Sequence, residues 1–246
     1  MSTTENKVAL ITGASRGIGA AIAERLSKDG FTVIVNYSGN AAPAEELARK
    51  IEQSGGRALT AKADVSDAEA VHRMFDAAET AFGGVDVVVN NAGILMLSAI
   101  AEASDANFDR QISVNLKGTF NTLREAGKRL RNGGRIINFS TSVVGTKLET
   151  YGVYAATKAA VETLTAIMSK EMRGRSITVN AVAPGPTATD LFLHGKSDEL
   201  IARMAKMNPL ERLGAPEDIA AAVSFLAGPD GSWINGQVLR ANGGMV

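Results

Sequence analysis

The stretch TGASRGIGAAIAERL, residues 12–26, decides the fold. It follows the apolar run VALIT, which starts at Val8, and it places Gly13, Gly17 and Gly19 between that run and a stretch with helical spacing. Glycines permit a tight turn and a close backbone approach, and the free amides of a helix N-terminus bind a pyrophosphate. Because a strand precedes the turn and a helix follows it, the stretch predicts a dinucleotide-binding unit.

Apolar runs rich in β-branched residues recur along the chain and alternate with amphipathic stretches. The predicted strands begin at Val8, Phe31, Arg57, Val85, Arg135, Ser176 and Gln237. Four are preceded by glycines, at the places where a helix needs a left-handed final residue: Gly30, Gly55 with Gly56, Gly83 with Gly84, and Gly133 with Gly134. This order predicts an α/β fold, a single-domain Rossmann fold with a doubly wound, seven-stranded parallel sheet and helices on both faces.

Length and charge limit the classes of function. The 246 residues suffice for one sizeable core, and 26 basic residues balance 26 acidic ones. Such a chain has no field of one sign that attracts nucleic acid or an anionic membrane surface. The chain has no cysteine, no apolar run near the roughly 20 residues of a spanning helix, and a polar opening, MSTTENK, unlike a secretory signal. We therefore predict one cytoplasmic domain over residues 1–246, without nucleic-acid or membrane partners.

The end of the second predicted strand indicates which dinucleotide is bound. Its sequence, VIVNYSGN, has Asn36, Tyr37 and Ser38 where a carboxylate often holds the adenosine ribose, and Arg16 stands in the glycine turn. A guanidinium without a neighbouring carboxylate suits a 2′-phosphate. The sequence therefore favours NADP over NAD.

Six motifs in order identify the chain as similar to the single-domain short-chain dehydrogenases/reductases. They are TGASRGIG from Thr12, Asp64 with Val65, NNAG from Asn90, Asn115 in SVNLKG, Tyr154 with Lys158 in a YxxxK pattern, and PGPTAT from Pro184. The resemblance covers essentially the whole chain and is strongest to β-ketoacyl-acyl carrier protein reductases, trihydroxynaphthalene reductase-like enzymes and glucose dehydrogenase-like enzymes. It implies a single-domain oxidoreductase.

The resemblance also implies a cofactor site that follows these motifs. Asp64 and Val65 flank the adenine, Asn90 and Gly93 line the trough, and the PGPTAT segment meets the nicotinamide. The full predicted NADP(H) site is Gly13, Ser15, Arg16, Gly17, Ile18, Gly19, Asn36, Tyr37, Ser38, Asp64, Val65, Asn90, Ala92, Gly93, Tyr154, Lys158, Pro184, Gly185, Thr187 and Thr189.

Tyr154 and Lys158 are spaced i, i+4, so on a helix both side chains project from one face. A free phenol has a pKa near 10, and a neighbouring ammonium favours phenolate, so Lys158 is predicted to lower the pKa of Tyr154. Tyr151 is assigned to packing or to the substrate mouth. By resemblance, Asn115 helps a water chain that relays protons through Lys158.

The hydroxyl that holds the substrate oxygen is less clearly marked. Relatives place a serine 13 residues before the tyrosine, and here that position is Thr141. Ser142 keeps the SxxG relation to Gly145 and is preferred as the catalytic hydroxyl, while Ser140 and Thr141 remain open. The predicted mechanism is that NADPH delivers hydride to a carbonyl carbon, Tyr154 protonates the oxygen, and Ser142 stabilises it.

Substrate and assembly are predicted only in outline. A 3-oxoacyl thioester or a cyclic or aromatic ketone is plausible, reaction direction stays open, and a segment over about 190–213 resembles a substrate cover with Leu193, Met204 and Met207 as apolar candidates. Apolar helices around 108–130 and 153–172, with the closing strand, resemble the surfaces through which relatives form homotetramers; a dimer stays open.

Two other classes of function were weighed against this prediction. A cofactor sensor or scaffold without chemistry is the alternative that keeps the nucleotide site. A serine hydrolase using His194 lacks a GxSxG motif, and His72 and His194 stand too far apart to predict a metal site.

Overall fold

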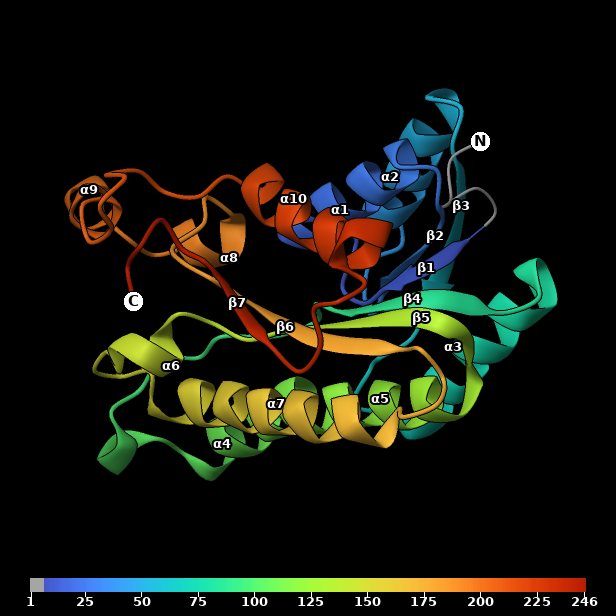
Figure 1. The fold of residues 1–246 in the computed structure, drawn as a ribbon. Helices are drawn as coiled ribbons and strands as arrows, with labels where there is room; N and C mark the ends of the chain where they lie inside the picture. The colour runs from blue at the N-terminus through green and yellow to red at the C-terminus, as the bar shows by residue number, and fades with distance from the viewer. Residues whose placement is uncertain (1–6) are drawn as a thin grey trace.

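A computed structural model of the protein describes residues 7–246, so most of the opening MSTTENK lies outside the described residues. Seven parallel strands form one sheet in the order β3-β2-β1-β4-β5-β6-β7 (Figure 1). The strands are β1 Val8–Ile11, β2 Thr32–Tyr37, β3 Arg57–Lys62, β4 Val85–Asn90, β5 Leu130–Phe139, β6 Thr178–Pro184 and β7 Val238–Ala241. The predicted doubly wound sheet is confirmed.

Helices connect the strands and cover the sheet on two sides (Figure 1). The α-helices are α1 Gly17–Lys28, α2 Ala42–Gln53, α3 Ala68–Phe82, α4 Asp105–Gln111, α5 Gly118–Arg129, α6 Val143–Thr146, α7 Gly152–Glu171, α8 Asp190–Leu193, α9 Asp198–Ala205 and α10 Pro216–Ala227. The remaining turns are η1 Ile100–Glu102, the π-helix η2 Ile112–Lys117, and η3 Pro229–Gly231.

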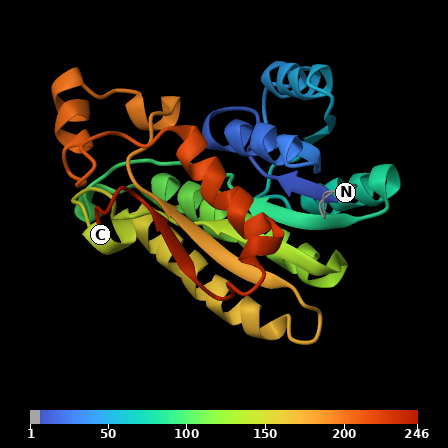
Figure 2. The same ribbon diagram turned by 45° about the horizontal axis from the view of Figure 1, so that its top comes forward.

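Alternation along the strands divides the core into two layers. In β1, Ala9 and Ile11 pack with α1, α2 and α10, whereas Val8 and Leu10 pack with α3, α5 and α7. Successive strand side chains point to opposite faces, so a sheet covered on both faces needs apolar residues at nearly every position. Figures 1 and 2 both show α10 lying beside α1 on one face.

One strand begins earlier than the glycines predict. Gly133 has a positive φ of 79°, yet it lies inside β5, which starts at Leu130 directly after α5. Val85 pairs with Leu130 and Val87 pairs with Arg135, so the register shifts between these pairs. The glycine pair therefore forms an irregularity within a strand and does not end a helix, because local sequence does not reveal which residues the neighbouring strand pairs with.

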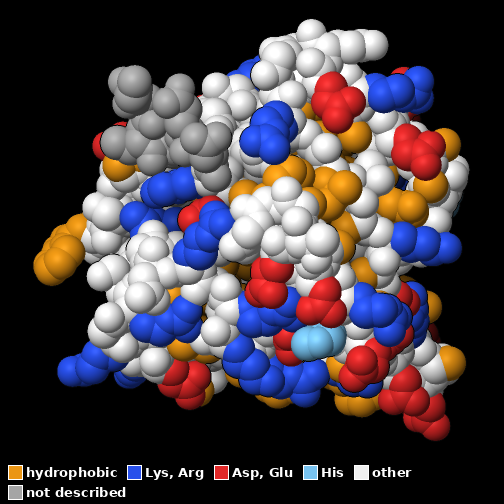
Figure 3. Space-filling model, turned by 90° about the vertical axis from the view of Figure 1, so that its right-hand side faces the viewer, with side chains coloured by type: hydrophobic (Ala, Val, Ile, Leu, Met, Phe, Trp, Pro, Cys, Tyr) orange, Lys and Arg blue, Asp and Glu red, His pale blue; other side chains and the backbone are white. Residues whose placement is uncertain are grey.

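The side chains at the two ends of the strands differ in kind. Figure 3 views the side where the strands begin, on the right of Figure 1, and there Lys and Arg side chains are mixed with Asp and Glu. The residues predicted for catalysis and cofactor binding lie in and beside the loops at the opposite side, where the strands end. None of the helices described, over residues 7–246, combines the length and apolar character needed to cross a membrane.

Candidate active site

The glycine turn after β1 is clamped by side chains from two neighbouring strand ends. Asn36 Oδ1 accepts a hydrogen bond from the Gly13 amide at 3.0 Å, and Asn91 Nδ2 donates to the carbonyl oxygens of Thr12 at 2.9 Å and Gly13 at 3.0 Å. Gly13 has a φ of +61°, and a Cβ on Gly19 would lie 2.5 Å from the Gly13 carbonyl oxygen. Only glycine fits at both positions, so the turn is fixed by the packing around it.

The open side of this turn suits a phosphate. Arg16 lies immediately before α1, is exposed, and makes no ion pair among residues 7–246. The first turn of α1 has no acidic residue, and its amides have the free hydrogen-bonding capacity of a helix N-terminus. The Ala14 amide donates to the Asn36 carbonyl oxygen at 2.8 Å, which holds the turn against the end of β2, where Ser38 is exposed.

Two predicted cofactor residues, Asn36 and Asn90, have buried side chains that form hydrogen bonds within the protein. Asn36 is buried, and its Nδ2 donates to the Ala61 and Ala63 carbonyl oxygens at 3.1 and 3.0 Å. Asn90 is buried and donates to Asn138 Oδ1 at 2.8 Å. Both side-chain amides lie below the protein surface. A cofactor would therefore contact these residues only through their backbone atoms.

Asp64 and Val65 follow β3 at one edge of the sheet, and neither lines the pocket described below. Asp64 Oδ1 accepts hydrogen bonds from the Ser66 amide and hydroxyl at 2.9 and 2.7 Å, and Arg110 approaches its other oxygen at 3.8 Å. The Val65 side chain is buried against Gly118, where an added Cβ would come within 2.5 Å of it. This segment is thus rigidly placed after β3.

Asn115 lies in the π-helical turn η2 and bridges to the loop after β4. Its Oδ1 accepts from the Ile94 amide at 2.8 Å, and its Nδ2 donates to the Ile94 carbonyl oxygen at 2.9 Å. Single π-turns inside helices are frequent at functional sites. A Cβ on Gly93 would lie 3.3 Å from Asn115 Oδ1 and 3.5 Å from Lys158 Nζ, so these three residues meet at one point.

Tyr154 and Lys158 share the first half of α7, and Tyr151 lies just before the helix. Lys158 is 3% exposed, its Nζ donates to the Phe139 carbonyl oxygen at 2.9 Å, and it lies 5.9 Å from the centre of the Tyr154 ring. Burial lowers the pKa of Lys158 to about 8 because the ammonium form loses hydration. The Tyr151 and Tyr154 rings meet edge to face, with centroids 6.4 Å apart.

Burial also raises the pKa of Tyr154 to about 12; a hydrogen bond from Thr141 opposes this rise and the charge of Tyr151 adds to it. The pKa of Tyr154 is thus raised where the sequence predicted it to be lowered, because desolvation of the phenolate is the largest influence; that Lys158 favours the phenolate stays a prediction. Burial therefore favours the protonated form of the Tyr154 phenol.

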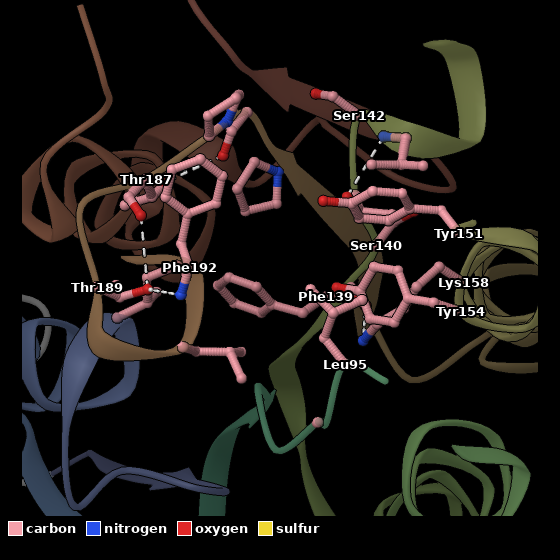
Figure 4. A pocket seen from close by; sticks show the side chains of 18 of the residues that line it. Leu95, Phe139, Ser140, Ser142, Tyr151, Tyr154, Lys158, Thr187, Thr189 and Phe192 are labelled. Atoms are coloured by element: carbon pink, nitrogen blue, oxygen red, sulfur yellow. Dashed lines mark hydrogen bonds between the residues drawn. The ribbon is translucent and has the colours of Figure 1, made fainter. Parts of the chain in front are cut away.

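The three hydroxyls that follow β5 point in different directions. Thr141 Oγ1 accepts from the Val143 amide at 3.3 Å, and Thr141 lines the pocket beside Tyr154, whose pKa it lowers. Ser140 Oγ donates to Glu162 Oε1 at 2.5 Å, and Ser142 Oγ donates to the Ala183 carbonyl oxygen at 3.3 Å. Ser142 lies well apart from Tyr154 in Figure 4. The catalytic role of Ser142 stays a prediction, but the geometry favours Thr141.

A pocket opens beside these groups, between α7 and the segment after β6 (Figure 4). Among the residues that line it, Lys158 is the single charged one. Nine predicted site residues line it: Ile18, Gly93, Ser142, Tyr154, Lys158, Pro184, Gly185, Thr187 and Thr189. Asn115, Ala92 and the residues of the glycine turn other than Ile18 lie beyond the lining, along the edge of the sheet.

Segment 190–213 contributes only part of its length to this pocket. Leu191, Phe192 and Met204 line it, whereas Leu193 and Met207 do not. Lys196 lies over the Phe192 ring, with Nζ 4.7 Å from the ring centre, and bonds to the Phe192 carbonyl oxygen. His194 ends α8 and is not part of the lining.

Some residues of the site escaped the sequence prediction. Asn91 lies in the NNAG motif, from which the prediction takes only Asn90, Ala92 and Gly93, although the Asn91 amide holds the glycine turn. Asn242 and Met245 come from the segment after β7, and Met245 lines the pocket. No local pattern marks these last two, because their partners lie about a hundred residues away.

Comparison with known proteins agrees with this architecture. A family model described as Enoyl-(Acyl carrier protein) reductase matches residues 13–246. The chain is 48% identical over 250 residues to a short-chain type dehydrogenase/reductase of Picea abies, a match that covers 98% of this chain and 92% of the relative. It is 44% identical over 254 residues to an NADPH-dependent aldehyde reductase-like protein, chloroplastic, of Arabidopsis thaliana, covering 98% and 94%.

A solved structure extends the agreement to three dimensions. A short-chain dehydrogenase from Burkholderia cenocepacia J2315 in complex with NADP superposes with a TM-score of 0.93 at 35% identity, covering 98% of each chain. The sheet order, the glycine turn and the tyrosine–lysine pair occur in a chain that matches these proteins over nearly its whole length. The chain therefore belongs to the short-chain dehydrogenases/reductases, a family of oxidoreductases.

Proposed function

We propose that the protein is an NADPH-dependent carbonyl reductase that converts an uncharged aldehyde or ketone with an apolar body into the corresponding alcohol. One observation carries this proposal: Tyr154 stands beside buried Lys158 in a pocket whose lining, among the described residues, has no other charged side chain. A carbonyl that takes up a hydride needs a proton on its oxygen, and a phenol in such a pocket can supply it.

The residues present fit NADP(H). The free amides at the start of α1 suit the pyrophosphate. Arg16, which makes no ion pair with a described residue, and exposed Ser38, with no acid at the end of β2, suit a 2′-phosphate. The Arabidopsis relative is named as NADPH-dependent and the Burkholderia structure as a complex with NADP, which supports the same cofactor here. Bound NADPH would supply a hydride to the carbonyl carbon.

Side chains of the protein are assigned to protonating and stabilising the carbonyl oxygen of the substrate. As the carbonyl double bond becomes single, its electron pair moves to oxygen, which takes the proton of Tyr154 Oη. We assign the hydroxyl of Thr141 to the same oxygen, since Thr141 stands 13 residues before Tyr154 and lines the pocket beside it. Lys158 and Asn115, which meet at Gly93, are assigned to replacing the proton on Tyr154.

The walls of the pocket support an apolar substrate. Leu95, Leu148, Tyr151, Phe192 and Met204 surround the opening, and no arginine lines it to pair with a carboxylate or phosphate. A cyclic or aromatic ketone fits this lining better than the acidic carrier of a 3-oxoacyl thioester. We assign the segment over about 190–213 to covering the substrate, since Leu191, Phe192 and Met204 come from it.

A spectrophotometric panel tests the proposal. Purified protein with NADPH or NADH is offered aromatic aldehydes, cyclic ketones, quinones, 3-oxoacyl thioesters and 2-oxo acids, and cofactor oxidation is followed. We expect turnover with NADPH on uncharged apolar carbonyls and little with 2-oxo acids. Tight NADPH binding without turnover on any carbonyl would instead support a sensor or scaffold.

Assembly is proposed on the evidence of exposed apolar side chains. Phe108, Phe120 and Ile167 are 46–49% exposed on the α4, α5 and α7 side, and Trp233 is 95% exposed before β7. We propose a homotetramer, which a light-scattering mass tests directly against a dimer. The cytoplasmic location stays a prediction.

A further inference from the structure

The segment after β7 reaches back to the loop that carries the catalytic hydroxyl. Asn242 Nδ2 donates to Ser142 Oγ at 2.9 Å and to the Val246 carbonyl oxygen at 3.3 Å. Asn242 Oδ1 accepts from the amides of Gly244 at 3.0 Å and Met245 at 3.2 Å. One amide side chain therefore folds residues 242–246 into a compact turn and ties that turn to Ser142.

Ser142 is fixed from three directions. Its amide donates to the Pro184 carbonyl oxygen at 2.9 Å, and its hydroxyl donates to the Ala183 carbonyl oxygen while accepting from Asn242. It is 3% exposed. These bonds use the hydroxyl's one proton and one of its lone pairs, so the hydroxyl is already engaged on the side away from Tyr154 (Figure 4).

Close packing completes the connection. A Cβ on Gly145, in α6, would lie 2.5 Å from a Val246 methyl, and a Cβ on Gly185 would lie 2.9 Å from the Asn242 Cα. Met245, held between these contacts, lines the substrate pocket. The turn thus rests on α6 and on the end of β6 at once.

From these contacts we propose that Asn242 is a positioning residue for the reaction: by holding Ser142 it fixes the adjacent Thr141, which lines the same pocket as Tyr154. This inference rests on the proposed carbonyl reductase function. It gives Ser142 a role without contact to substrate, and it explains why a serine next to the reacting hydroxyl is turned toward β6 and β7.

A double-mutant cycle tests the proposal. Asn242→Ala, Ser142→Ala and the double variant are compared for kcat and for KM of NADPH on the best carbonyl substrate. We expect each single change to lower kcat about tenfold, the worth of one hydrogen bond, with KM for NADPH unchanged. Because both changes break the same bond, the double variant should be no worse than either single variant.

Matched controls separate positioning from loss of fold. Asn235→Ala removes a comparable hydrogen bond, 2.8 Å to the Val179 amide, at the other end of β7. Its melting temperature should fall as for Asn242→Ala while kcat stays near that of the native protein. Ser142→Ala is the second route if Asn242→Ala fails to fold, because it leaves the turn's own hydrogen bonds intact.

Two outcomes would overturn the inference. One is a kcat within twofold of the native protein for either single variant. The other is a loss in Ser142→Ala that equals the loss in Thr141→Ala while Asn242→Ala is unaffected, which would make Ser142 catalytic. A native protein inactive on every carbonyl would instead reject the proposed function.

Discussion

The cofactor half and the substrate half of this site are built differently. The glycine turn is held by Asn36 and Asn91, each at the end of a strand directly beside β1 in the sheet. The substrate half joins α7, α6, the segment after β6 and the turn after β7, whose contacts span about a hundred residues of sequence. A site built on neighbouring strand ends has its backbone fixed by the sheet, whereas one built from loops depends on contacts such as that between Asn242 and Ser142.

The largest expected effect tests the substrate half at its reacting atom. Tyr154→Phe removes the proton donor and keeps the ring, so kcat should fall at least about a thousandfold. NADPH binding, measured by fluorescence, should be unchanged because the cofactor half is untouched. Retained turnover would remove Tyr154 from the mechanism. Tyr151→Phe is the matched control, with an expected loss of less than about tenfold.

Lys158 links the substrate half to stability. Its pKa is lowered to about 8 from 10.5, so between these values the unfolded chain binds a proton that the folded protein does not. The free energy of unfolding should therefore rise with pH across this window. Lys158→Met should be more stable near pH 7 by up to about 3 kcal/mol, with the advantage vanishing near pH 10.5.

Urea unfolding at several pH values measures this difference. Lys170→Met, late in the same helix and exposed, is the control and should show no such pH-dependent gain. A constant difference between Lys158→Met and the native protein from neutral to alkaline pH would contradict the depressed pKa.

Arg16 tests the cofactor half in isolation. Arg16→Ala should raise KM for NADPH by about ten- to fiftyfold, the loss of one charge-assisted contact, while KM for NADH stays the same. Arg25→Ala, at the other end of α1 and paired with Asp29, is the control and should leave both constants unchanged. An equal change in KM for NADPH and for NADH would show that Arg16 does not contact the 2′-phosphate.

The smallest effect concerns the loop before α7. Thr150 has a φ of +68°, a left-handed conformation that a β-branched residue adopts at a penalty. Thr150→Gly should raise the free energy of unfolding by about 1 kcal/mol. Thr163→Gly, exposed within α7, should lower it by a similar amount, and two losses of equal size would show that the loop is unstrained.

Sequence patterns predicted the sheet and the glycine turn after β1 well because both depend on local periodicity and on glycines such as Gly13, whose φ is positive. They misplaced the start of β5, since pairing with Val85 sets it. They also gave the wrong direction for the pKa of Tyr154, because spacing reveals a neighbouring charge but not the degree of burial. The contact of Asn242 with Ser142 has no local signature at all.

The π-turn η2 has a consequence for any chimera or deletion in this chain. A π-turn holds one residue more than an α-turn, so it shifts the phase of side chains between α4 and α5. Gln111 faces the Met96 backbone, Asn115 faces Ile94, and Leu123 faces the core. The π-turn sets the rotation about the helix axis that lets all three side chains point this way. Removing a single residue between Ile112 and Lys117 would wind the segment into continuous α-helix and force at least one of these three contacts to be lost.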